Sequence, residues 1–488
     1  MCISLRSVLV VVWLASIGCF AQDTSNSAEE LARLGRELEE TRSELAASRR
    51  QIDELRRGLE ELRNQVQANH PSGNEAPPTT EPSAAVADQD VGFLAAKVAE
   101  LHQDKVESAS KYPVKLSGLV LFNAYRNSGS LDMQDLPSLA FPSSPGFPNG
   151  SVGATLRQTV LGIDATGPKL FGAHTSAGAE IDFAGGSPTT AYGVTSGLLR
   201  LRTAQVTLDW QKTSLHIGQD SPFFSPLSPT SYATMLEPAM AWSGNLWVWT
   251  PQIEVERRLT LRPHSLLVLQ GGLLDPLTEE TPPFQGVVPT AGEATRIPAL
   301  AGRIAIDHSS AAHYPFVIGL AGYRARQRYQ NFNQIDSWTV NSDFMVPFGK
   351  HLELSGEAYE GQAVGGLGGG IWTSVVYPEP SEPHTAVHPL RSAGGWVQLK
   401  LKPITRVEIN GAFGQDENFA ENLRFFPTPY MDLGFPPLQK NRTEFVNLIY
   451  EPNSFLLFAV EYRHLFTAPA IGESASGDHL NLAAGVRF

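Results

Sequence analysis

From Val114 to the C-terminus, apolar residues alternate with small or polar ones, and beyond the first residues no apolar run approaches the length of a membrane helix. The last nine residues show the alternation most clearly. One face of an extended strand there carries Leu480, Leu482, Ala484, Val486 and Phe488, and the other carries Asn481, Ala483, Gly485 and Arg487. An ordinary amphipathic strand would also alternate. A strand with one lipid-facing and one lumen-facing side, ending on an aromatic residue, is typical of an outer-membrane barrel.

The alternation predicts an all-β transmembrane barrel over residues 111–488, with about sixteen antiparallel strands. The expected strands are Lys115–Arg126, Thr155–Thr166, His174–Phe183, Leu198–Trp210, Ser214–Gln219, Leu246–Leu261, Ser265–Leu274, Ala299–Asp307, Phe316–Arg328, Ile335–Val346, His351–Gly361, Ser392–Leu401, Arg406–Gln415, Thr443–Tyr450, Phe455–Leu465 and Asp478–Phe488. Short connections such as Lys402–Thr405 and Glu451–Ser454 favour tight periplasmic turns. Long ones, Asp132–Gly153, Thr278–Pro298, Gln362–Arg391 and Asp416–Arg442, favour outside loops.

The N-terminus predicts a secretory signal peptide over residues 1–21: Arg6, an apolar run from Val8 to Ile17, and small residues up to Ala21. Cleavage there would remove Cys2 and Cys19, the 2 cysteines of the chain, and with them any disulfide or cysteine metal site. Lipidation of Cys19 is the alternative. Ser16 stands where a lipidation signal usually has leucine.

Residues 22–69 are expected to form a parallel periplasmic coiled coil. Its oligomerisation seam holds Leu31, Leu34, Leu38, Leu45, Ile52, Leu55, Leu59, Leu62 and Val66. Glu37 and Glu44 are each followed five residues later by an arginine, the spacing that pairs parallel neighbours. Thr41 and Ser48 weaken the seam, so the oligomer state stays open.

A linker rich in Pro, Ser and Thr covers residues 70–90, and a short helix is expected over 91–110. The helix would either continue the coiled coil or cap the periplasmic mouth of the barrel.

Sorting strand residues by parity gives candidate pore-lining charges, because an arginine facing mid-bilayer lipid costs roughly 2–4 kcal/mol and must look inward or sit at the rim. The candidates are Arg200, Arg202, Glu254, Glu256, Arg258, Arg262, Arg324, Arg326, Arg328, Glu353 and Glu357. Basic and acidic walls facing each other would draw an anionic solute to the basic side. The alternative is that these charges pair with one another and stiffen the wall. For Arg324, Arg326 and Arg328 we favour the role in attracting anionic solutes. Three like charges on one strand repel one another, so their closeness needs a functional reason.

The segment from Gly218 to Asn245 is rich in Pro, Ser and aromatic residues between two strands. It could fold into the barrel as a constriction loop, with Phe223, Phe224, Tyr232 and Met235 packing and Asp220 and Glu237 as its charges. An outer loop at a subunit contact is the equal alternative.

The sequence resembles DcaP-like trimeric porins in the order of its parts, in Lys105–Asn123 and Leu215–Asp220, and in its terminal Arg487-Phe488. That resemblance implies a sixteen-stranded barrel in the bacterial outer membrane, a homotrimer with a periplasmic coiled coil, and diffusion of small anions past an arginine-rich constriction. It does not assign individual constriction residues.

The expected function is therefore an outer-membrane porin with lipid, its own copies and small anionic solutes as partners, and with no cofactor or metal. The net charge of −13 argues against nucleic-acid binding. An enzyme is not expected, since neither Gly-x-Ser-x-Gly nor His-Glu-x-x-His occurs. The alternative function is a structural anchor that tethers the envelope through the coiled coil, which would reach about 50 Å.

Overall fold

The computed structural model describes residues 112–143, 149–186, 197–278, 289–310, 313–329, 334–376, 387–424 and 437–488. The expected signal peptide, coiled coil, linker and short helix lie outside the described residues. No helix in the described part of the chain is both long and apolar enough to cross a membrane.

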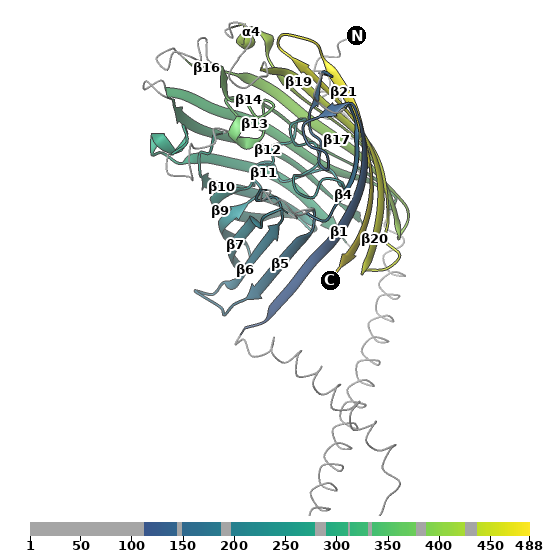
Figure 1. Ribbon diagram of the computed structural model, residues 1–488. Coiled ribbons are helices and arrows are strands. Elements are labelled where there is room, and N and C mark those ends of the chain that lie inside the picture. Colours follow the sequence, from purple (N-terminus) through teal and green to yellow (C-terminus); the bar gives the residue numbers. More distant parts are fainter. Residues whose placement is uncertain are drawn as a thin grey trace, which may run out of the picture. The chain divides into compact units, whose positions relative to one another are not determined.

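One antiparallel sheet dominates the described residues (Figure 1). Its strands are β1 (Val114–Ser128), β4 (Ser151–Thr155), β5 (Val160–Thr166), β6 (His174–Asp182), β7 (Arg200–Trp210), β8 (Thr213–Asp220), β9 (Thr250–Arg262), β10 (Ser265–Leu274), β11 (Ala299–Ser310), β12 (His313–Arg328), β13 (Gln334–Phe348), β14 (Leu352–Gln362), β17 (Arg391–Ile404), β18 (Val407–Asn418), β19 (Leu438–Tyr450), β20 (Leu456–Pro469) and β21 (Ala475–Arg487). Smaller elements lie in the connections: β2 (Ser130–Leu131), β3 (Ala140–Phe141), β15 (Val375–Val376), β16 (His388–Pro389), the 3-10 turns η1 (Glu293–Thr295) and η3 (Gly365–Leu367), and α4 (Ala420–Leu423).

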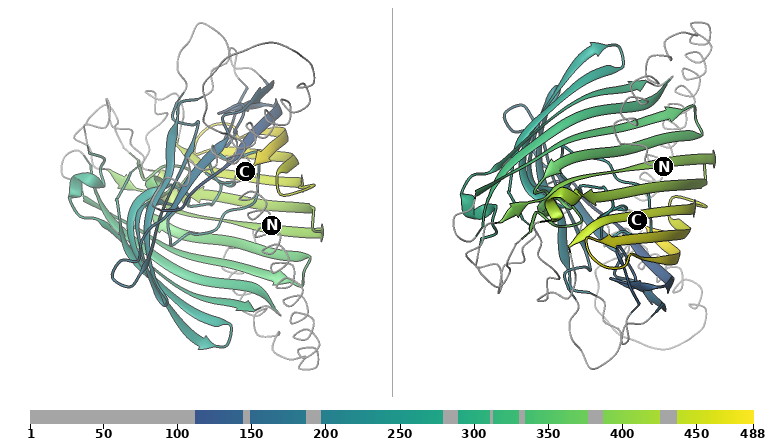
Figure 2. Two further views of the ribbon diagram at one scale, coloured as in Figure 1. Left: turned by 90° about the horizontal axis from the view of Figure 1, so that it is seen from below. Right: turned by 90° about the horizontal axis from the view of Figure 1, so that it is seen from above.

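The sheet closes on itself because its first and last strands pair. β1 and β21 are antiparallel, from Leu119 opposite Arg487 to Ser128 opposite Asp478. β4 and β5 both pair with β1, in successive stretches of it, so they are two halves of one interrupted strand. The 17 segments therefore make sixteen positions around a barrel. Figure 2 shows the same sheet from below and from above.

The predicted strands agree with the observed ones, with two exceptions. The expected strand Thr155–Thr166 is interrupted before Val160, where the side chain of Gln158 turns inward to bond to the backbone of Ala233. The expected strand Leu246–Leu261 begins only at Thr250, because Trp247 donates its backbone N–H to the carbonyl of Leu367 instead of to a neighbouring strand.

Short and long connections alternate, which gives the barrel a turn end and a loop end. β7 and β8 meet across Trp210 and Thr213, and β17 and β18 across Ile404 and Val407. The opposite end carries the connections of β8 to β9, β10 to β11, β14 to β17 and β18 to β19. Because neighbouring strands run antiparallel, successive connections alternate between the two ends, so the tight turns gather at one end and the long connections at the other.

The two faces of the wall differ as the alternation predicts. On β21, His479 and Asn481 are fully buried or nearly so inside the barrel, whereas Leu480 and Leu482 are 42% and 53% exposed outside. The same holds for Ile253, Ile304, Leu320, Val340 and Val446, which form an apolar band on the outer surface. A contiguous apolar surface of this extent marks an interface with lipid or protein.

Candidate functional site

The interior of the barrel is occupied by the connection between β8 and β9, residues 221–249, which we call the inner loop. Phe223 and Phe224 begin it and are 5% and 0% exposed. Phe224 packs on the inward-facing Tyr323 of β12, with ring centroids 5.3 Å apart. Of the two alternatives for this segment, the structure shows the inward fold.

The inner loop then follows the wall in strand order. Glu357 on β14 accepts hydrogen bonds from the Ser225 hydroxyl (2.6 Å) and the Leu227 backbone N–H (2.7 Å). Gln398 on β17 accepts from the Thr230 N–H (2.7 Å), and Asn447 on β19 donates to the Thr230 carbonyl (2.8 Å).

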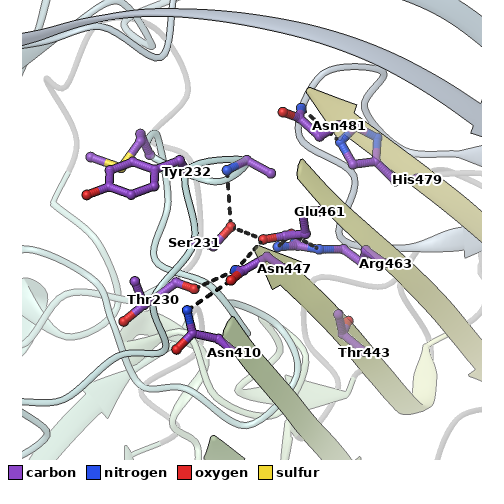
Figure 3. Close-up of polar contacts among 12 residues, drawn as sticks. Thr230, Ser231, Tyr232, Asn410, Thr443, Asn447, Glu461, Arg463, His479 and Asn481 are labelled. Atoms are coloured by element: carbon purple, nitrogen blue, oxygen red, sulfur yellow. Dashed lines mark hydrogen bonds and ion pairs between the residues drawn. The ribbon is translucent and has the colours of Figure 1, made fainter. Parts of the chain in front are cut away.

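Beyond Thr230 the inner loop passes over the seam between β20, β21 and β1. Figure 3 shows the Ser231 hydroxyl donating to Glu461 on β20, beside Asn447. Asn123 on β1 donates to the Tyr232 carbonyl (2.8 Å), and Arg487 on β21 donates to the Tyr232 hydroxyl (2.8 Å). The loop therefore lies along the wall and does not hang free in the lumen.

The return part of the inner loop packs directly on backbone. Gly244 has φ +97°, and a Cβ there would come within 2.3 Å of the Gly395 nitrogen on β17. Only glycine permits this approach and this φ together. Nearby, Trp242 stacks on Trp372 with centroids 5.0 Å apart.

A basic cluster faces the end of the inner loop. Asp182 on β6, whose side chain is 0% exposed, binds Arg200 at 2.7 Å and has Arg202 at 3.8 Å. The two guanidinium groups lie 5.1 and 4.8 Å from the Trp249 ring centroid, within cation–π range. The arginine side chains remain 27% and 12% exposed, so the accessible part of the cluster is positive.

Other charged residues predicted to line the pore do lie on the inner face, where they form ion pairs or hydrogen bonds with neighbouring side chains. Arg258 bonds to Asp209 and lies 3.5 Å from Glu256, and Glu254 and Glu256 both accept from Gln270. Glu353 lies 3.7 Å from Lys400, which is equally close to Glu408. Arg262 is exposed at the last residue of β9, at the turn end.

The prediction that Arg324 and Arg326 face the lumen is wrong. Ala321, Tyr323, Ala325 and Gln327 of β12 are buried inside, so the arginines between them point outward and are 68% and 49% exposed. Arg328 shares their parity at the end of the strand. Alternation separates two faces but does not say which is inner. Here small and aromatic residues face in because Phe224 of the inner loop packs on them.

Sequence reasoning missed two buried ion pairs on the inner face. Arg303 of β11 and Asp343 of β13 lie 2.6 Å apart, with 7% and 2% of their side chains exposed. Arg463 and Glu461 of β20 lie 2.7 Å apart, with 4% and 2% exposed. The sequence does show that these residues alternate with the apolar Ile304, Val340 and Val460 on the same strands, which the structure places on the outer surface. Asp182 and Trp249 gave no such signal, because their partners come from other strands and from the inner loop.

Of the predicted charges of the inner loop, Asp220 ends β8 and Glu237 is enclosed. Burial, the largest cause, and the neighbouring Asp132 together raise the pKa of Glu237 from 4.5 to about 7, against the lowering effect of Arg200. Its Oε2 is buried with no hydrogen-bond partner in the described residues. Glu237 is therefore close to half protonated at neutral pH.

This pKa predicts a pH-dependent stability. Because the folded state holds the Glu237 proton up to about pH 7 and the unfolded chain only to 4.5, the stabilisation is complete below pH 4.5 and is lost as the pH rises through 7. The loss is on the order of 3 kcal/mol. Urea unfolding at pH 5 and pH 8 should show a smaller difference in Glu237→Gln than in the unsubstituted protein. Glu421→Gln, at a 65% exposed side chain, is the control. An unchanged pH dependence in Glu237→Gln would contradict the assignment.

A closed barrel of sixteen strands with a long connection folded against its inner wall defines a porin-like fold. Among solved structures, the chain is similar to the outer membrane channel DcaP of Acinetobacter baumannii, with a TM-score of 0.59 and 17% identity over 78% of this chain and 99% of that one. The resemblance seen in the sequence is confirmed at the level of the fold.

Two further structures are more distant. The anion-selective porin from Comamonas acidovorans gives a TM-score of 0.49 and 11% identity over 78% of this chain and 100% of that one. OmpF of Salmonella typhi in complex with daunomycin gives 0.47 and 11%, over 77% and 98%. Comparison with protein-family models gives no match, and comparison with curated proteins gives none.

Proposed function

We propose that this protein is a bacterial outer-membrane porin, through which small hydrophilic and mainly anionic solutes diffuse. The observation that carries the proposal is the combination of an apolar outer band with a polar interior in a closed sixteen-strand wall. A barrel of this strand number encloses a space wide enough for an aqueous channel, and lipid is the environment that an apolar outer band requires.

The inner loop supports the role of a constriction. It is held by side chains of β14, β17, β19, β20 and β1, so it narrows the lumen at a fixed place. Hydrogen bonds at this many points hold the inner loop in one position. A fixed constriction that does not open and close fits passive diffusion of small solutes.

The preference for anions is argued from the Arg200 and Arg202 cluster. Asp182, the carboxylate within ion-pair distance of both guanidinium groups, is fully buried, whereas both arginine side chains keep an exposed part that a passing solute can meet. Positive groups in a confined, low-dielectric passage raise the local concentration of anions. The cluster therefore favours anions over cations at this point of the lumen.

The proposed oligomer is a homotrimer, supported by a difference around the outer wall. Strands β6 and β8 have only 9 and 8 residues, and the strand beside β1 is interrupted into β4 and β5, whereas β12 and β13 have 16 and 15. Apolar residues on the short arc reach the loop end, with Val152 81% and Leu199 61% exposed. A second copy of the chain covering this arc would bury them.

Single-channel recording of the refolded full-length mature protein in a planar bilayer tests the function. Open steps that close in threes, with a reversal potential showing anion preference under a salt gradient, are expected. A folded barrel that passes no current would overturn the proposal.

Removing the basic cluster should change selectivity. In Arg200→Gln/Arg202→Gln we expect the anion preference to fall at least about threefold, because the two accessible guanidinium groups are gone while Asp182 stays. Reversal potentials under a tenfold KCl gradient measure this. Arg391→Gln, on the outer surface, is the control and should leave selectivity unchanged. An unchanged reversal potential in the double variant would place the selectivity elsewhere.

A further inference from the structure

The outward arginines of β12 belong to a wider feature that we call the outer belt. It consists of charged side chains on the outer face of β12 to β21 and β1, between the apolar band and the loop end. Its members are Arg126, Arg324, Arg326, Asp336, Glu360, Arg391, Glu417, Lys440, Arg442, Glu444, His464 and Asp478. Charged side chains on the outer face are costly within lipid hydrocarbon, so the belt marks the level where the hydrocarbon ends.

Three cations of the belt have a carboxylate of their own. Arg391 lies 2.8 Å from Glu360, Lys440 3.1 Å from Glu417, and Arg442 3.3 Å from Glu444. These pairs neutralise themselves and leave little to attract an outside ion.

β12 differs from the strands that carry these three pairs. In the described part of the chain Arg324 and Arg326 share one carboxylate, Asp336 of β13, at the longer distances of 3.8 and 3.4 Å. Both side chains are about half exposed or more, so the patch carries a surplus positive charge and free guanidinium donors. A guanidinium presents a planar fork of donors that matches a phosphate.

The surroundings of this pair suit an amphipathic ligand. Trp338 of β13 lies opposite Arg324 in the register and shares its outward face. Toward the turn end follow Leu320 and Val340, which are 56% and 52% exposed. Along one line of the wall, hydrogen-bond donors for a phosphate are thus followed by an outward-facing tryptophan and then by an apolar surface. Tryptophan is enriched at the level of lipid headgroups.

We propose that Arg324, Arg326 and Trp338 form a binding site for the phosphate headgroup of an anionic lipid in the leaflet at the loop end, whose acyl chains lie on Leu320 and Val340. This proposal rests on the outer-membrane location given under the proposed function, but it does not depend on channel activity. A protein that binds lipid without conducting would refute only the channel.

Native mass spectrometry of the delipidated full-length mature protein, titrated with detergent-solubilised lipid A carrying two phosphates, tests the site. Arg324→Gln/Arg326→Gln should raise the apparent Kd about tenfold. The matched control is Arg391→Gln/Arg442→Gln, which removes two belt arginines that have their own carboxylates and should change Kd less than about twofold. Heat-modifiable migration on gels verifies folding of each variant, and Arg324→Lys/Arg326→Lys, which keeps the charge, should lie between.

Five outcomes would overturn the proposal. Equal Kd values in all variants, or an equal loss in the control pair, would show no site at β12. Lipid A stripped of its phosphates binding as tightly would exclude phosphate recognition. Complete displacement by millimolar inorganic phosphate would indicate a small-anion site instead of a lipid site. A lower number of protomers in the double variant would show that the patch contacts a second copy.

Discussion

Replacing the inner loop, residues 221–249, by a short turn should increase single-channel conductance several-fold. Asp220 and Thr250 are cross-strand partners at the ends of β8 and β9, so a tight turn can join them without disturbing the wall. The replaced residues lie inside the barrel against strands from β14 round to β7. Removing them widens the path for ions, because a sixteen-strand wall alone encloses a broad channel.

The expected cost of this replacement is lower stability, since the apolar cluster around Tyr323 loses the side chains of Phe223 and Phe224. Shortening the exposed connection between β20 and β21, around Gly472, is the matched control and should leave conductance unchanged. If conductance of the loop-replaced protein stays within experimental error of the parent, the inner loop does not restrict the current, and the constriction must be formed by other residues.

Glu461→Ala should destabilise the barrel by about 3–5 kcal/mol, because it leaves the Arg463 cation buried without its partner. Glu461 accepts hydrogen bonds from Arg463, Asn447 and the Ser231 hydroxyl, so one carboxylate joins the wall to the inner loop (Figure 3). The same change should release the loop at Ser231, and we expect noisier open-channel current. Urea unfolding followed by tryptophan fluorescence measures the stability.

A control for this prediction lies on the neighbouring strand. Glu444 of β19 also pairs with an arginine, at 3.3 Å, but both side chains are more than a third exposed. Glu444→Ala should therefore cost no more than about 1 kcal/mol. In Glu461→Ala/Arg463→Leu the buried cation is removed as well, and part of the lost stability should return. Equal effects of the two single variants would show that burial does not govern these pairs.

The positions of strands were predictable because alternation is a local property. Each of the sixteen expected strands overlaps an observed one, and turns such as the one after Ile404 lie where proline and polar residues interrupt the pattern. The terminal strand shows why: Leu480 and Leu482 can face outward only if Asn481 faces inward, whatever the rest of the chain does.

The inner face of β12 could not be predicted in the same way. Arg324 and Tyr323 are neighbours of opposite parity, and the sequence does not state which of them the barrel encloses. The decision came from Phe224, a residue about a hundred positions earlier, which packs on Tyr323 inside the barrel. The site residues Asp182 and Trp249 likewise acquire their roles from arginines on another strand.

By itself, the sequence determined the strands, their two faces and the alternation of turns with long connections, because these depend on residues one to a few positions apart. The tertiary structure alone decided which face of β12 is inner, that residues 221–249 follow the inner wall, and that Arg200 and Arg202 share a buried carboxylate. Those outcomes depend on contacts such as Asn123 with Asn481, 358 positions apart, which form only when the wall has closed.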